Sequence, residues 1–242
     1  MTTLVDIQNL KKQFGGLTAV NAVTFSVAEG ETVALLGPNG SGKTTVLNMI
    51  SGALAPTSGS ISLAGEDIGG LAPNRIAHKG VARTFQLVRV LPSLTVAENV
   101  TAALAFRPNH LWGHAARDRA EQLLAEVGLG GRGDEHANDL TYIDQKRMEL
   151  ARALAAEPRL LLLDEWLSGL NPTELRTGID LITSLGQRGM TVLLVEHIME
   201  AVRALCSRAV VMNVGNKIAD GPTADVLADS AVISAYLGEG HA

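Results

Sequence analysis

The stretch that decides the fold is Gly37-Pro38-Asn39-Gly40-Ser41-Gly42-Lys43-Thr44-Thr45. It fits the pattern G-x-x-x-x-G-K-[ST] of a phosphate-binding loop without a mismatch. Glycines in such a loop let successive backbone N–H groups converge on a triphosphate, and the helix that follows adds its partial positive charge. Lys43 can then reach the β- and γ-phosphates, while the Thr44 hydroxyl lies where Mg²⁺ binds.

The residues on either side of the loop supply the context that the motif needs. Thr32 to Leu36 form an apolar run that is typical of a buried strand, and Thr45 to Ile50 continue as the first turns of a helix. The alternative, a glycine-rich turn without a ligand, does not require a strand and a helix on its two sides. The sequence therefore predicts a nucleoside triphosphate site.

Composition excludes several classes of protein. The chain has 242 residues, 46% of them hydrophobic, but its apolar runs are far shorter than the roughly 20 residues needed to cross a bilayer. A net charge of −5 and an aromatic content of 3% argue against a protein that coats nucleic acid. The single cysteine, Cys206, excludes an intramolecular disulfide, and we expect no secretory signal after Met1.

The pattern along the chain predicts an α/β fold with an antiparallel β subdomain near the N-terminus and a helical insert. The first thirty residues alternate apolar and polar side chains, residues 57–60 are expected to form a turn, and residues 61–63 a strand. Residues 87–157 are rich in Ala and Leu at helical spacing, with a break at the glycines of 128–133. We therefore expect a single domain, in which 1–86 and 158–242 form the nucleotide-binding core and 87–157 a helical subdomain. Short helices are expected from residue 224 to 237.

Two apolar strands end in residues with catalytic chemistry. Leu160 to Leu163 lead into Asp164 and Glu165, and Thr191 to Val195 lead into Glu196 and His197. Because the carboxyl ends of parallel strands meet at one edge of a sheet, these side chains should lie beside the phosphate loop. Asp164 is then placed to hold Mg²⁺, and Glu165 to orient and polarise an attacking water.

Several spaced motifs give the chain a resemblance to the ATP-binding-cassette ATPases, which have a P-loop NTPase core. Their order is the phosphate loop, Gln86 within Arg83-Thr84-Phe85-Gln86, the segment Leu140–Gln145, Asp164-Glu165, Ser168–Asn171 and His197. More narrowly, the chain is similar to the ATPase subunits of bacterial branched-chain amino-acid uptake systems. That resemblance depends on Phe14-Gly15-Gly16-Leu17, Val81–Gln86, Gly169–Pro172 and the ending Ala235-Tyr236-Leu237-Gly238.

The resemblance implies a role for each matched position. Phe14 would stack on the adenine of ATP, although core packing is the alternative for this side chain. Gln86 would sense Mg²⁺ and the attacking water, and His197 would contact the γ-phosphate. The signature segment Leu140–Asp144, with Thr141 and Ile143, would close over ATP bound to a partner subunit, and Ser168–Asn171 would line the subunit interface.

Two departures from the family pattern stand out. The family signature is typically Leu-Ser-x-Gly-Gln, whereas this chain has Thr141, Ile143 and Asp144 in place of Ser, Gly and Gln. A β-branched Ile143 cannot take glycine's positive-φ conformations and adds bulk, and Asp144 brings a negative charge toward the triphosphate. We therefore expect this signature to support hydrolysis poorly. Trp166, where the family usually has proline, is assigned no role beyond packing.

The resemblance implies an ATPase that uses ATP and Mg²⁺ to drive import from the cytoplasmic face of the inner membrane, as a peripheral subunit. Its partners would be transmembrane permease subunits, a second ATPase subunit and, indirectly, a substrate-binding protein, but no nucleic acid. Val88, Val90 and Leu91 are either core residues or the lining of a groove for a permease helix. Two alternatives remain: a non-transport ATPase of the same family, and a catalytically weak regulatory cassette.

Overall fold

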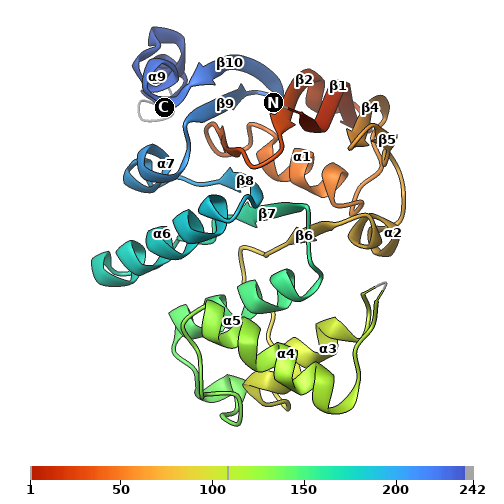
Figure 1. The fold of residues 1–242 in the computed structure, drawn as a ribbon. Coiled ribbons are helices and arrows are strands. Elements are labelled where there is room, and N and C mark those ends of the chain that lie inside the picture. The colour runs from red at the N-terminus through yellow and green to blue at the C-terminus, as the bar shows by residue number, and fades with distance from the viewer. Residues whose placement is uncertain (1, 108, 238–242) are drawn as a thin grey trace.

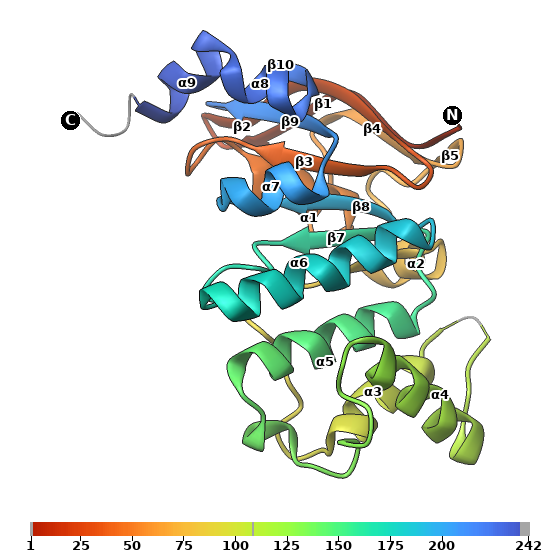
Figure 2. The ribbon, with the colours of Figure 1, turned by 60° about the vertical axis from the view of Figure 1, so that its left-hand side comes forward.

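The computed structural model describes residues 2–107 and 109–237, and it confirms the expected α/β class. Two β-sheets and the helices around them form stacked layers, with a separate group of helices at the bottom of Figures 1 and 2. Within the described residues, no helix is both long enough and apolar enough to span a membrane. The layers matter for function because they bring the ends of several strands to one edge.

The larger sheet has the strand order β10-β9-β3-β8-β7-β6, and all of its neighbours are parallel except β9 and β10. Both of its faces are buried, which explains the apolar runs in the sequence. In β7, Leu160 and Leu162 face one core, whereas Leu161 and Leu163 face the other. The strands are β3 (Thr32–Leu36), β6 (Val81–Arg83), β7 (Leu160–Asp164), β8 (Thr191–Val195), β9 (Arg208–Asn213) and β10 (Asn216–Pro222).

The smaller sheet is antiparallel, with the order β2-β1-β4-β5, as the alternation in the first thirty residues predicts. The prediction of a turn at residues 57–60 is wrong, because Ser58, Gly59 and Ser60 belong to β4. Gly59 has φ +84° and lies at a register shift between β1 and β4. The glycine that suggested a turn therefore allows an irregularity within the strand. The strands are β1 (Thr3–Phe14), β2 (Leu17–Ala28), β4 (Ser58–Leu63) and β5 (Glu66–Asp67).

Helix α1 (Lys43–Ile50) packs between the two sheets, and its Val46, Leu47 and Met49 share one core with both of them. Other helices lie on the opposite face of the larger sheet or beside its edge strands (Figure 2). The phosphate loop is therefore clamped between a buried strand and a buried helix. These remaining helices are α2 (Pro73–His78), α6 (Pro172–Gln187), α7 (Met199–Leu205), α8 (Thr223–Ala228) and α9 (Ser230–Leu237).

The group of helices at the bottom of Figures 1 and 2 consists of α3 (Val96–Leu104), α4 (Gly113–Glu126) and α5 (Tyr142–Ala155). Helix α4 ends at Glu126, just before the glycines of 128–133, as the sequence predicts. A short 3₁₀ helix, η1 (Ala137–Asp139), precedes α5. Thr141 caps α5, because its hydroxyl accepts a hydrogen bond from the backbone N–H of Asp144.

Candidate functional site

The phosphate loop joins β3 to α1 in a conformation that depends on its glycines. Gly37 has φ +142°, and a Cβ there would come within 2.1 Å of the Met212 carbonyl oxygen. Gly42, which precedes α1, has φ +105°, and its Cβ would come within 2.5 Å of the Ala19 carbonyl oxygen. Only glycine fits at these two positions, because both the backbone angle and the space exclude a side chain.

Lys43 lies inside this loop and is only 5% exposed. Its Nζ donates to the carbonyl oxygens of Gly37 at 2.7 Å and Pro38 at 2.8 Å. The ammonium is thereby held in the middle of the loop, where it can neutralise an anion. The remaining members of the predicted loop are Asn39, Gly40, Ser41, Thr44 and Thr45; Ser41 is buried, and Asn39, Gly40 and Thr44 face solvent.

The three side chains predicted to be catalytic come together in the structure. The carboxylate of Glu165 accepts a hydrogen bond from Gln86 Nε2 at 2.6 Å and lies 2.8 Å from His197 Nε2. A carboxylate only accepts, so Nε2 of His197 carries the proton in this pair. Glu165 also has φ +51°, a left-handed conformation that costs a non-glycine residue about 1–3 kcal/mol and is concentrated at functional sites.

Asp164, at the end of β7, is held by a residue that the sequence analysis assigned no role. Arg83 Nη2 donates to Asp164 Oδ2 at 2.7 Å, and both side chains are buried. The same guanidinium donates through Nη1 to Asn48 Oδ1 at 2.6 Å and to Ser51 Oγ at 3.2 Å, both on or next to α1. Arg83 therefore connects β6, β7 and the helix of the phosphate loop. An arginine ending a buried strand was the signal that could have identified it.

The residues predicted to bind the metal, Thr44, Gln86 and Asp164, line one groove of 910 Å³. A hydroxyl, an amide oxygen and a carboxylate are the oxygen donors that Mg²⁺ prefers. In the described residues, no three His, Cys, Asp or Glu side chains gather into a metal site of their own. This donor set fits a Mg²⁺ ion that arrives with the phosphates of a nucleotide and keeps several waters.

Phe14 lies at the end of β1 and is 45% exposed, so core packing does not explain it. The Nζ of Lys12 lies 5.2 Å from the centre of its ring. The β1–β2 hairpin that carries Phe14 borders the phosphate loop, because Ala19 of β2 lies against Gly42. An exposed aromatic ring on this hairpin is available to stack on a base.

Thr141 and Ile143 lie on the first turn of α5, in the helical group, and are not part of the Gln86–Glu165–His197 cluster. Ile143 is buried, and it is absent from the residues with positive φ. The expectation that residue 143 has to take a glycine-like positive φ is therefore wrong for this chain, because residue 143 is helical. The expectation that its bulk hinders hydrolysis stays a prediction, because the phosphates concerned would be bound to a partner subunit. Ser168–Asn171 lies next to this turn, with Gly169 against the ring of Tyr142.

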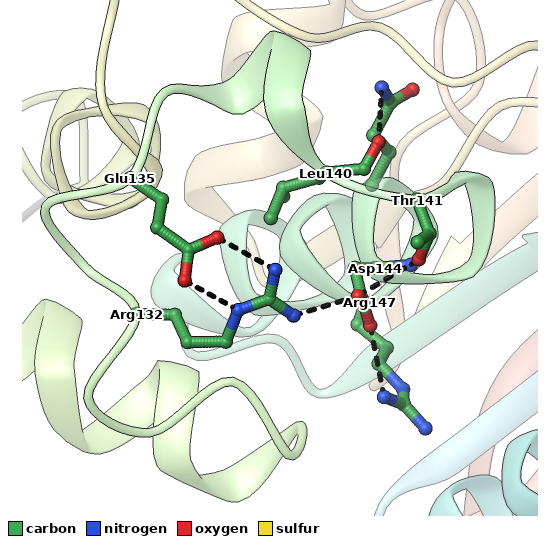
Figure 3. A network of polar contacts seen from close by, with 7 residues as sticks. Arg132, Glu135, Leu140, Thr141, Asp144 and Arg147 are labelled. Atoms are coloured by element: carbon green, nitrogen blue, oxygen red, sulfur yellow. Dashed lines mark hydrogen bonds and ion pairs between the residues drawn. The ribbon is translucent and has the colours of Figure 1, made fainter.

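Asp144 does not stand as an isolated negative charge. Its Oδ2 accepts from Arg132 Nη1 at 2.7 Å and from the Thr141 hydroxyl at 2.9 Å, and Oδ1 from Arg147 Nη1 at 3.0 Å (Figure 3). Burial alone would raise the pKa of Asp144, but the bonds from Arg132 and Thr141 outweigh burial and hold this pKa below its ordinary value. The carboxylate is therefore ionised, with two guanidinium groups beside it.

Trp166 does more than fill space. It is fully buried, its indole Nε1 donates to the Lys146 carbonyl at 3.2 Å, and Lys146 Nζ donates back to the Trp166 carbonyl at 2.8 Å. These reciprocal bonds join α5 to the segment that follows Glu165. No sequence pattern predicted the contact between Lys146 and Trp166.

Glu196 and Tyr236 are further residues that sequence reasoning missed. Glu196 is buried, accepts from the Leu167 N–H at 2.7 Å, and has a pKa that burial raises to about 7. Tyr236, on α9, accepts a hydrogen bond from the Gly37 N–H at 2.7 Å. The C-terminal helix thus reaches the first residue of the phosphate loop. Gly238, the last residue of the ending that supported the resemblance, lies outside the described residues.

The walls of the 910 Å³ groove include Phe85, Leu87 and Arg89, but not Val88, Val90 or Leu91. Val90 packs against the core of the helical group instead. Of the two alternatives for these residues, Val90 therefore takes the core position. Val88 and Leu91 do not line this groove, and their contact with a permease helix stays a prediction.

Comparisons with known proteins match this geometry. A family model described as ABC transporter matches residues 20–168, and one described as Branched-chain amino acid ATP-binding cassette transporter matches residues 216–242. BraF of Pseudomonas aeruginosa, a high-affinity branched-chain amino acid transport ATP-binding protein, is 40% identical in an alignment that covers 98% of each of the two chains.

Solved structures show the same fold. The ADP conformation of MJ1267, an ATP-binding cassette of an ABC transporter, has a TM-score of 0.90 and 28% identity, covering 98% of this chain and 100% of that one. The cassette MJ0796, in a dimeric post-hydrolysis state bound to ADP and Pi, has a TM-score of 0.81 and 26% identity, with coverages of 91% and 99%. This protein is an ATP-binding cassette and belongs to the ABC transporter family.

Proposed function

We propose that this protein hydrolyses ATP to drive an importer of branched-chain amino acids. The observation that carries the proposal is the Glu165 carboxylate, held by Gln86 and His197 at the edge where the phosphate loop opens. The substrate class is supported by the similarity to BraF and by the family match over residues 216–242. Gln86, Glu165 and His197 come from three separate segments, so the fold has to assemble them.

In this proposal each loop and strand end has one task. Backbone N–H groups of the loop and the Lys43 ammonium bind the phosphates, and Phe14 stacks on the adenine. Glu165 takes a proton from the attacking water; each of its oxygens retains a lone pair besides the one engaged by Gln86 or His197. His197 and Gln86 fix the carboxylate and respond when the γ-phosphate is present or lost.

Mg²⁺ would be held by Thr44, Asp164 and Gln86, and when bound it neutralises phosphate charge during transfer. Arg83 keeps Asp164 in place for this task by tying it to α1. Thr44, Asn48 and Ser51 stand one helical turn apart on the same side of α1. The distance between the hydroxyl and carboxylate ligands is thereby fixed before the nucleotide arrives.

The assembly we propose contains two cassettes and a pair of permease subunits at the cytoplasmic face of the membrane. ATP would be enclosed between this chain and a second, different cassette, and a substrate-binding protein would deliver the amino acid. The permease would dock at the groove between α1 and the helical group, where Phe85, Leu87 and Arg89 are accessible. In this proposal residues 87–157 move as the helical subdomain, and Gln86 is its hinge to the core.

Co-purification from detergent-solubilised membranes tests the proposal. A tagged chain should bring down membrane-spanning subunits, and vesicles containing the complex should take up leucine in an ATP-dependent manner. A Lys43→Ala chain is the control, since it should retain the partners and lose uptake. Recovery of ribosomes or DNA would instead favour a non-transport ATPase, and a complex with unchanged uptake in the control would make this chain a regulatory cassette.

A further inference from the structure

The first turn of α5 carries a network of charges that neither the phosphate loop nor the Glu165 cluster uses. Figure 3 shows the Arg132 guanidinium between two carboxylates, Glu135 on one side and Asp144 on the other. Arg132 comes from the loop between α4 and η1, outside the helix that it contacts. Arg147, on α5 itself, contacts the second oxygen of Asp144. Asp144 is thus bracketed by arginines from two parts of the chain.

The loop that delivers Arg132 is anchored to α3. The Val96 N–H donates to the Glu135 carbonyl at 2.9 Å, and the Ala97 N–H donates to the Gly133 carbonyl at 2.9 Å. Glu135 in turn orients the guanidinium through two bonds, at 2.8 Å from Nε and 2.7 Å from Nη2. A bidentate grip of this kind fixes the plane of an arginine. Arg132 therefore reaches Asp144 in a defined orientation.

Asp144 occupies the third position of α5, where a carboxylate interacts with the partial positive charge of the helix end. In the proposed assembly the same helix end faces a triphosphate held by the other cassette. A bare carboxylate there would repel the phosphates and cancel the attraction of the helix end. Arg132 and Arg147, both within 3.0 Å of the carboxylate, remove that repulsion.

We propose that Arg132 is a positioning residue, which with Arg147 neutralises Asp144 and so allows this altered signature to close over ATP on the second cassette. The inference rests on the proposed function. The pair Arg132–Asp144 replaces the neutral glutamine of the family pattern by two opposite charges that sum to zero. Arg132 acts through Asp144 and Thr141, whose hydroxyl donates to the same carboxylate oxygen.

Hydrogen exchange in the purified transporter complex, with Glu165→Gln to prevent turnover, tests this inference. The first amides of α5 have no partner within the helix, so closure of the second cassette should protect peptide 140–147 as ATP is added. Arg132→Gln should raise the ATP concentration for half-protection of this peptide about tenfold, on the scale of coupling between charged groups at an interface. Adding Asp144→Asn should restore it.

Peptide 37–45 of the same complex reports ATP on this chain's own loop and should respond equally in all variants. Arg117→Gln is the matched control: it removes an arginine of the same helical group that pairs with Glu121 and Asp134 and not with Asp144, so peptide 140–147 should respond as in the parent. Equal half-protection in the parent and Arg132→Gln, no rescue by Asp144→Asn, or no protection of peptide 140–147 while 37–45 is protected would each overturn the inference. Absence of protection at 37–45 would instead contradict the proposed function.

Discussion

The phosphate loop and the first turn of α5 both have to manage the charge of a nucleotide, and they do so in different ways. At the loop, the groups that bind phosphate are contiguous in sequence, and Lys43 is held by carbonyl oxygens of the loop itself. At α5, the charge of Asp144 is balanced by Arg132, which lies on another loop. A local motif is therefore sufficient to recognise the first region, whereas the second can be understood only from its three-dimensional contacts.

The largest effect that separates the two regions is expected from Lys43→Ala. Loss of the ammonium leaves the phosphates to backbone dipoles alone, so ATP turnover should be abolished and nucleotide binding weakened. Equilibrium binding and phosphate release measure the two effects. Arg147→Ala, which removes a cation from the α5 turn, serves as the comparison and should leave ATP binding to this chain's own loop unchanged. Full turnover by Lys43→Ala would remove the loop from the mechanism.

Glu165→Gln should retain ATP binding and reduce hydrolysis about 10²-fold or more, the usual contribution of a positioned base. The amide preserves the shape of the side chain but cannot take the proton from water. An ATP-bound closed complex should then accumulate, which gel filtration with ATP would detect. Undiminished turnover would move the role to another group, and His197, 2.8 Å from this carboxylate, would be examined first.

Sequence reasoning predicted the elements whose pattern is local. Thr32–Leu36 is a strand between two cores, and the glycines after Glu126 end a helix, because apolar periodicity and glycine act within a few residues. The turn expected at 57–60 failed since Gly59 is equally suited to an irregular strand, and only pairing with β1 decides between the two. In this segment, hydrogen bonding to β1 outweighed the local preference of these residues for a turn.

The candidate site divides in the same way. Glu165 and His197 could be named from the ends of strands and Gln86 from the resemblance to the family, and the structure places them in contact. Arg83 could have been suspected from its place at the end of a strand, but its partner Asp164 could not have been named. The role of Trp166 and the compensation of Asp144 could not be predicted either, because each depends on a partner in another element. Pairwise contacts between distant segments are a property of the packed chain and leave no period in the sequence.

Arg83→Met tests whether Asp164, which the sequence pattern predicted, also depends on a partner from a distant segment. Removing the guanidinium leaves the buried Asp164 carboxylate unpaired, which should lower the free energy of unfolding by about 3–5 kcal/mol. The exposed pair Arg159–Glu29 offers the matched control, since Arg159→Met should cost less than about 1 kcal/mol. Urea unfolding of both variants measures the difference. Equal losses would show that Asp164 does not need its partner.

Glu196 should make the stability of the segment after Glu165 depend on pH. Burial raises its pKa to about 7 from the ordinary value of 4.5, so between these two pH values the folded protein holds a proton that the unfolded chain releases. This contribution is complete below pH 4.5 and is lost as the pH rises through 7, a change of about 3 kcal/mol. Glu196→Gln should remove that part of the pH dependence of urea unfolding, which lies between about pH 4.5 and 7. Parallel profiles of the two proteins would contradict the assignment.

The smallest effects concern the altered signature and decide whether the two cassettes are equivalent. In a homodimer, both sites would combine a complete phosphate loop with the turn of Thr141, Ile143 and Asp144, and turnover should be slow. In a heterodimer, Lys43 and Glu165 would face the signature of a different cassette. One site would then be efficient, and the site closed by this chain's α5 would mainly bind ATP.

Turnover of the isolated chain and of the assembled complex should therefore differ, with the complex faster. Ile143→Gly with Asp144→Gln should speed the isolated chain a few-fold and change the complex by less than about twofold, because the efficient site does not use this turn.

Ile143 is buried, so glycine also removes packing and costs about 2–4 kcal/mol of stability. Asp144→Gln alone separates the two effects: the charge is already neutralised by Arg132, so this variant should stay close to the parent. If the isolated chain is as fast as the complex, and neither variant changes either, the two sites are equivalent and the asymmetric assembly is wrong.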